Sequence, residues 1–520
     1  MVFASPFFLT VFLPAVLLAA WGLGAAGKAL AGRRGVAFSW GPVNALLLAA
    51  SLLFYFWGEG WGVLWLVASV LFNAFCAKLA APREGRGERF RRGAVAAAVA
   101  GNLAFLGWFK YAAFAARSLD LLPGVHIPVP EVALPLGISF YTFQAMSYVV
   151  DVGRGTVPPA ARLADFACYV AFFPQLVAGP IVRYADIAER LRERSVDLAR
   201  VSSGFKRFLC GLAKKALVAN VVAEAADAVW AVLDGGSAVH PLAAWGGLLA
   251  YALQIYYDFS GYSDMAIGMG RMLGFDFKEN FLHPYAAVSV RDFWRRWHIS
   301  LSTWFRDYLY IPLGGNRRGL ARTVFNGLAV FALCGLWHGA GAMFLLWGLW
   351  HGAFLTLERL LGARGIFQPL EKSFPIIGKN GGNFPMIGKK VSNGWKTSAL
   401  RLPGHFYALA VAFAGWILFR SDSPAVAWRM VESLAGCGDV AREARGLWMA
   451  FPPKILWGLA VGAACSLPLG PALRNLLRRC LARVPAVAEA AEWAWCTLLG
   501  LAAMLFLAGG SYNPFIYFRF

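Results

Sequence analysis

Long apolar runs dominate this chain of 520 residues. Stretches of about 20 apolar residues recur along most of its length, which is what an α-helix needs to cross the hydrocarbon core of a bilayer. The runs lack the alternation of polar and apolar residues that is typical of a transmembrane barrel. Only 15% of the residues are charged, whereas a soluble protein would carry roughly 25%. The sequence therefore predicts an all-α polytopic membrane protein.

The formal net charge of +21 follows from basic residues placed between the apolar runs. Cytoplasmic loops that orient a membrane protein have this charge bias, and no module of arginine and aromatic residues typical of nucleic-acid binding accompanies it. We therefore expect no nucleic-acid partner. The eight cysteines form no CxxC pair or Cys/His cluster, so the sequence predicts no disulfide framework, no metal site and no bound cofactor.

The positions of the basic loops along the sequence predict about 11–13 transmembrane or re-entrant helices. The segment 166–180 is short and interrupted by two prolines, which favours a re-entrant segment. Arginine alternates with aromatic residues in RDFWRRWHISLSTWFRDY, which favours amphipathic helices in the membrane interface. We expect three parts: a core with the N-terminal spans (1–360), a polar basic insert (363–400), and C-terminal spans with an aromatic tail (401–520).

The pentapeptide LWHGA occurs at 336–340 and again at 349–353, and it places His338 and His351 in an apolar stretch. Thirteen helical residues turn the chain by about 220° beyond three full turns, so the two rings would point to nearly opposite faces. Gly339 and Gly341 moreover predict a break between two helices. The two imidazoles are thus not expected to form a catalytic or metal-binding pair. An ionisable group at membrane depth is a functional candidate, and the alternative is a histidine that bridges two helices.

Three other places could carry chemistry. His298 follows two arginines near the membrane surface, where a neutral imidazole could orient a substrate or transfer a proton; the alternative is an interfacial aromatic residue. Asp258, in YYDFSGYSDMAIG, could hold an arginine or a histidine in place, or belong to a polar network between helices. Tyr141 and Gln144 share a helix face and could line a polar tunnel or join two helices.

Five long motifs occur in order: PLGISFYTFQAMSYVVDVGRG, FFPQLVAGPIVRY, YYDFSGYSDMAIGMGRMLGF, NFLHPYAAVSVRDFWRRWHISLSTWFRDYLYIPLGG and LCGLWHGA. Together they resemble the membrane-bound O-acyltransferase family, and within it the branch of alginate O-acetyltransferases and D-alanyl transfer proteins. The resemblance covers residues 40–360 and the closing NPFIYFRF. The insert at 363–400 has no counterpart in these motifs.

The resemblance implies an acyltransferase of the cell membrane, which is the inner membrane in a Gram-negative cell. His338 and His298 fall on the family's two histidines, His338 being the catalytic one, and the role of His351 is less defined. The family fold would place His338 in a thinned core with a cavity open toward both faces. The implied partners are membrane lipids, a cytoplasmic acyl thioester such as acetyl-CoA, an exported polysaccharide such as alginate, and a secreted SGNH or esterase-like acetyltransferase.

Tyr517 is the only hydroxyl residue in the closing FIYFRF. We hypothesise that it accepts the acyl group before a secreted transferase carries it to the polymer, because a covalent intermediate splits one transfer across the membrane into two steps. The alternative is a hydrophobic anchor.

Other functions remain open at this stage. D-alanyl transfer to teichoic acid would differ in its donor, a D-alanyl carrier protein. A transporter would suit carboxylates and broken helices at membrane depth, although no inverted repeat is evident. A scaffold for an export complex could coexist with the enzyme.

Overall fold

The computed structural model describes residues 3–85, 87–120, 122, 126–363, 401–438 and 451–510. Most of these residues are helical, and none of them forms a β-strand. Within the described part of the chain, seven helices or continuous helical segments are long and apolar enough to cross a membrane, or eight if the bent pair α19–α20 counts as one span. The predicted all-α polytopic fold is confirmed. The insert at 364–400 and the tail with Tyr517 lie outside the described residues.

In the described ranges, the α-helices follow one another along the chain, and five short π- or 3-10 segments lie before or between them. They are α1 (Leu13–Arg34), α2 (Gly41–Glu59), α3 (Val63–Ala80), α4 (Glu88–Leu119), α5 (Ile138–Arg154), α6 (Leu163–Ala171), α7 (Phe173–Leu176), α8 (Tyr184–Arg192), α9 (Leu198–Ala213), α10 (Asn220–Asp234), α11 (Pro241–Met272), α12 (Val290–Arg296), α13 (Ile299–Phe305), α14 (Gly319–His338), α15 (Ala342–Ala363), α17 (Arg401–Arg420), α18 (Pro424–Ala435), α19 (Pro453–Ser466), α20 (Leu469–Cys480) and α21 (Pro485–Ala508). The short segments are η1 (Phe8–Phe12), η2 (Gly60–Gly62), η3 (Lys214–Ala219), η4 (Pro284–Ala286) and η5 (Arg306–Tyr310).

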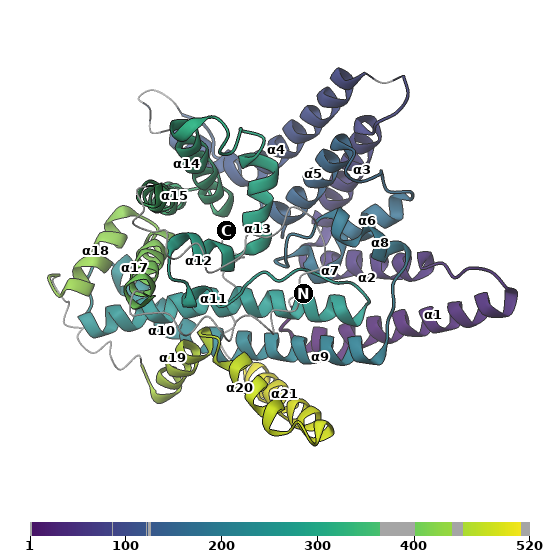
Figure 1. Cartoon of the computed structure of the whole chain (residues 1–520). Helices are drawn as coiled ribbons and strands as arrows, with labels where there is room; N and C mark the ends of the chain where they lie inside the picture. The colour runs from purple at the N-terminus through teal and green to yellow at the C-terminus, as the bar shows by residue number, and fades with distance from the viewer. Residues whose placement is uncertain are drawn as a thin grey trace.

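The long helix α11 forms the centre of the molecule and packs along α9 and α10 (Figure 1). Small residues explain how closely α9 and α11 approach. A Cβ atom on Gly211 would lie 2.6 Å from the carbonyl oxygen of Gly261, and one on Gly268 would lie 2.6 Å from that of Gly204. Glycines at these contacts let two helix backbones touch, which is a common way of packing helices in membranes.

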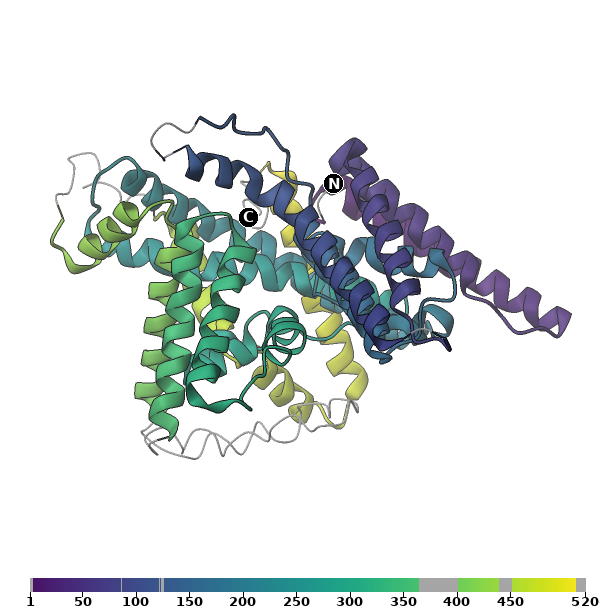
Figure 2. The ribbon, with the colours of Figure 1, turned by 90° about the horizontal axis from the view of Figure 1, so that it is seen from above.

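The helices α14 and α15 form a second tight pair, seen side by side in Figure 2. Added Cβ atoms on Gly335 and Gly348 would each lie 2.1 Å from a backbone carbonyl oxygen of the partner helix, that of Phe344 and that of Phe331. The two LWHGA copies lie in this pair. The helix break predicted from Gly339 and Gly341 is present between them.

The two segments with unusual sequence patterns, 166–180 and the arginine-rich segment, form short helices that pack against the rest of the protein. The 166–180 region contains α6 and the four-residue α7, and both are largely buried. In the arginine-rich segment, α12 and α13 each span seven residues. The Ser289 side chain caps α12 by accepting a hydrogen bond from the Asp292 amide at 3.0 Å. The aromatic side of α12 packs against α15 and α17, while Arg295 stays exposed.

Candidate active site

His338 is the last residue of α14 and is 3% exposed. The helix ends there because Gly339 adopts an extended backbone, with φ −160° and ψ 150°. A side chain at position 339 would collide with the Phe344 ring, since a Cβ atom would lie 2.1 Å from it. The glycine after the histidine is therefore what lets the chain turn sharply into α15 and leaves His338 at a helix end.

His298 lies between α12 and α13 and is fully buried. Its backbone is left-handed, with φ 42° and ψ 55°, a conformation that non-glycine residues seldom adopt and that tends to occur at functional sites. Its Nδ1 atom lies 3.3 Å from Oδ1 of Asn280. Burial lowers the pKa of His298 to about 3, so the ring is neutral near pH 7.

The structure brings these two predicted residues together. The ring centroids of His298 and His338 lie 6.5 Å apart, and the Trp337 indole contacts both, at 6.1 Å and 4.8 Å. Nε2 of His298 has no hydrogen-bond partner among the described residues. Because buried polar atoms are nearly always paired, this nitrogen is available to a ligand or water.

Aromatic side chains enclose His338. The rings of Trp347 and Phe419 lie 5.1 Å and 5.3 Å from its ring, both edge to face. Trp337 closes another side. Such walls exclude water and strengthen the electrostatic interactions inside.

His351 lies on α15 and is fully buried. Its ring packs against Trp294 at 5.2 Å and Trp347 at 5.3 Å. Trp347 thus contacts His338 and His351 alike, and the two histidines occupy different environments. The α17 backbone also approaches closely here, since a Cβ atom on Gly415 would lie 2.7 Å from Nε2 of His351.

The other predicted residues lie in the surrounding helices. Asp258 on α11 forms a buried ion pair of 2.7 Å with Lys215 on η3, which matches the alternative of a polar network between helices. Tyr141 and Gln144 are fully buried on α5. That helix borders the site through Phe140, whose ring lies 5.4 Å from Trp337.

Sequence reasoning missed Lys110 and Tyr111 of α4. The Lys110 amine donates to the backbone carbonyls of Trp337 and of His338, the latter at 3.1 Å. The Tyr111 hydroxyl donates to the Leu336 carbonyl. One signal was available: a lysine stands alone in the apolar run 93–116, and intramembrane ionisable residues are functional candidates.

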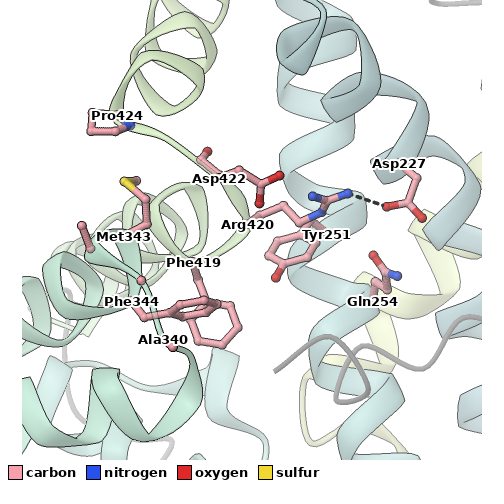
Figure 3. Close-up of a pocket in the computed structure, with 13 residues that line it drawn as sticks. Asp227, Tyr251, Gln254, Ala340, Met343, Phe344, Phe419, Arg420, Asp422 and Pro424 are labelled. Carbon is pink, nitrogen blue, oxygen red and sulfur yellow. Dashed lines mark hydrogen bonds and ion pairs between the residues drawn. The ribbon is translucent and has the colours of Figure 1, made fainter. Parts of the chain in front are cut away.

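A cavity of about 390 Å³ is lined in part by Phe419 (Figure 3), whose ring lies 5.3 Å from that of His338. Phe344 and Phe419 form its apolar side, and charged groups its polar side, where Arg420 pairs with Asp227 at 2.8 Å. Its lining comprises Asp227, Tyr251, Gln254, Ala340, Gly341, Ala342, Met343, Phe344, Phe419, Arg420, Ser421, Asp422 and Pro424. The cavity lies between the end of the first LWHGA motif, the middle of α10 and of α11, and the end of α17.

Comparison with known proteins now decides the family. The model of the MBOAT, membrane-bound O-acyltransferase family, matches residues 158–373. The chain is 36% identical to a "Probable alginate O-acetylase" of Pseudomonas putida over 100% of both chains. It belongs to the membrane-bound O-acyltransferase family. The sequence-based family prediction is confirmed, and the protein is a multi-pass membrane O-acyltransferase of the alginate O-acetylase branch.

Two further relatives carry other names. A peptidoglycan O-acetyltransferase of Helicobacter pylori is 35% identical over 57% of this chain and 60% of its own. A teichoic acid D-alanyltransferase of Bacillus subtilis is 27% identical over 42% of this chain and 57% of its own.

Proposed function

We propose that this O-acyltransferase takes an acetyl group from a cytoplasmic thioester such as acetyl-CoA and passes it to a hydroxyl on the outer side of the membrane, toward an exported polysaccharide such as alginate. The observation that carries the proposal is the buried imidazole pair His338 and His298, 6.5 Å apart, together with a cavity of about 390 Å³ that shares Phe419 with the surroundings of His338. The full-length likeness to an alginate O-acetylase supports the choice of acetyl group and polymer.

The distribution of basic residues supports an outward-facing cavity. Neither Lys nor Arg occurs in 216–270 or 323–358, and these stretches contain most of the residues that line it. The opposite ends of the same helices meet basic segments, for example Arg317 and Arg318 before α14 and Arg322 in its first turn. Because Lys and Arg accumulate in cytoplasmic loops, we assign the cavity to the outer face and the basic ends to the donor side.

The proposed reaction uses the imidazole of His338 as a neutral base among the aromatic side chains that surround it. The acceptor hydroxyl oxygen attacks the thioester carbonyl carbon while its proton moves to the imidazole of His338. The C–S bond of the resulting tetrahedral intermediate then breaks, and the leaving thiolate takes the proton back. General base catalysis of this kind contributes about 10²–10⁴-fold. We assign to the unpartnered Nε2 of His298 a hydrogen bond that orients the acceptor hydroxyl.

We extend the proposal to Tyr517 as a first acceptor, from which a secreted SGNH or esterase-like acetyltransferase would take the acetyl group. Its support is the single hydroxyl within the aromatic tail of the chain. In a Gram-negative cell the protein would then act in the inner membrane and pass the group to a periplasmic partner. Replacing Tyr517 by Phe should abolish polymer acetylation, and unchanged acetylation would refute the relay.

Proteoliposomes test the main proposal. Radiolabelled acetyl-CoA is added on the side of the basic loops, an alginate oligosaccharide is enclosed on the other side, and label is followed on the oligosaccharide and on the protein. We expect labelling by the wild type and none by His338→Ala. Labelling only from a D-alanyl carrier protein would favour the teichoic acid reaction. In cells, lost polymer export with intact acetyl transfer would instead favour a transporter.

A further inference from the structure

The end of α14 poses a hydrogen-bonding problem. If the helix continued, the carbonyls of Leu336, Trp337 and His338 would accept from the amides of residues 340–342. The chain leaves the helix at Gly339 instead, so these three carbonyls lose their helical partners. In the apolar interior of a membrane protein, such groups need other donors.

Two adjacent residues of α4 supply those donors. The Lys110 amine binds the Trp337 and His338 carbonyls, and the Tyr111 hydroxyl binds the Leu336 carbonyl. The Lys110 amine also lies 5.9 Å from the centroid of the Trp337 ring. Every orphaned carbonyl at the end of α14 therefore has a donor from α4.

We propose that Lys110 and Tyr111 form a clamp that fixes where α14 ends and thereby positions His338 for acyl transfer. The inference rests on the proposed role of His338 and adds two positioning residues to that reaction. Neither residue needs to touch the substrate.

The clamp matters because small displacements are costly in catalysis. A reacting group misplaced by about 1 Å can lose about 100-fold in rate. Without the clamp, the carbonyls of residues 336–338 can regain partners only if the last turn of α14 rearranges. That rearrangement would move the imidazole away from His298 and from the aromatic walls. A positioning defect should therefore lower kcat while leaving the KM for the donor largely unchanged.

The test uses the purified full chain in proteoliposomes, with acetyl-CoA as donor and an alginate oligosaccharide as acceptor. Lys110→Met removes the donor but keeps an apolar side chain of similar length. We expect kcat to fall at least about tenfold with the KM for acetyl-CoA within about twofold of the wild type. Lys110→Arg keeps a cationic donor and should recover part of kcat. Lys454→Met is the matched control, because Lys454 forms a surface pair with Glu224 and should leave kcat unchanged.

A kcat within about twofold of the wild type in Lys110→Met would overturn the clamp. If this variant does not yield folded protein, Tyr111→Phe decides, since it removes one hydroxyl group only. A kcat reduced about threefold or more at constant KM supports the proposal, and an unchanged kcat overturns it. His338→Ala in the same assay distinguishes the proposed function from the proposed clamp. Activity retained there refutes the proposed function, whereas activity lost there but kept in the Lys110 and Tyr111 variants refutes the clamp alone.

Discussion

The ring of His298 lies 6.5 Å from the ring of His338, although one residue joins two short helices and the other ends a long one. Each histidine lies at a break in the helical backbone: His298 has a left-handed conformation, and the extended Gly339 ends α14 directly after His338. The catalytic hypothesis follows from the short distance between the two rings.

The two LWHGA histidines should respond very differently to mutation. Replacing His338 by Ala should reduce acetyl transfer by about 10²–10⁴-fold, because the variant lacks the proposed general base. Replacing His351 by Leu should cost less than about tenfold, since that ring packs behind Trp347. Transfer rates from acetyl-CoA, normalised to folded protein, compare the two. Equal losses would argue against a single catalytic imidazole.

His298 should make the stability of the protein depend on pH. Its pKa is lowered to about 3 in the folded state by burial, from an ordinary value of 6.5. The unfolded chain therefore binds the proton more readily, and the stability contributed above pH 6.5 is lost as the pH falls from about 6.5 toward about 3. Asn tolerates the left-handed backbone, so His298→Asn should lessen this decline.

The measurement is the thermal unfolding midpoint in detergent between pH 7 and pH 4.5 for both proteins. At the lower end, the wild type should lose up to about 1.4 kcal/mol more per pH unit than His298→Asn. Parallel curves for the two proteins would show that His298 does not titrate in this way.

The α14–α15 contact should not accept a methyl group. Gly335→Ala places a Cβ atom 2.1 Å from the Phe344 carbonyl oxygen, so the helices must separate, at a cost of about 1–3 kcal/mol. Gly327→Ala on the same helix is the control, because nothing lies within 4 Å of its Cβ position. Only the first substitution should lower the unfolding midpoint and the rate of acetyl transfer.

Filling the cavity should block the acceptor but not the donor. Ala342 lines the cavity and is exposed, so Ala342→Trp can occupy the space without disturbing the core. We expect transfer to an alginate oligosaccharide to fall roughly tenfold or more, while hydrolysis of acetyl-CoA by water continues. If the rates of both reactions fall together, the cavity does not serve the acceptor alone. Ala342→Ser is the control, because it introduces only a small side chain.

The Asp258–Lys215 pair should act on stability rather than on chemistry. Asp258→Asn leaves a buried ammonium without its carboxylate, which costs about 3–5 kcal/mol. Replacing both residues by apolar ones of similar size should restore much of the loss. Calorimetric unfolding of the single and double variants measures this, and a double variant that is folded but inactive would instead indicate a catalytic role.

Local sequence patterns predicted part of this structure well. Apolar runs determine the helical membrane fold because a bilayer admits few other solutions. Gly339 and Gly341 predicted the break after His338, since glycine is common where a helix ends. The family motifs singled out His338 and His298, whereas the residues taken alone left the role of each open.

Tertiary contacts account for what sequence reasoning missed. The partners of Lys110 and Tyr111 are backbone carbonyls more than 200 positions away. Because every residue has a backbone carbonyl, the sequence does not indicate which ones accept these hydrogen bonds. The left-handed backbone of His298 likewise depends on packing around α12 and α13. Asp258 could have been matched to several cations, and only the packing of η3 against α11 selects Lys215.

Trp347 stands between two copies of one pentapeptide whose backbones differ: the first copy terminates a helix and the second continues one. The same five residues therefore form a buried helix end in one place and an ordinary helical turn in the other. On the proposed role of His338, the duplicated motif supplies a second histidine without a second reaction centre. Copies of this motif in related chains should therefore be compared by whether each copy ends a helix.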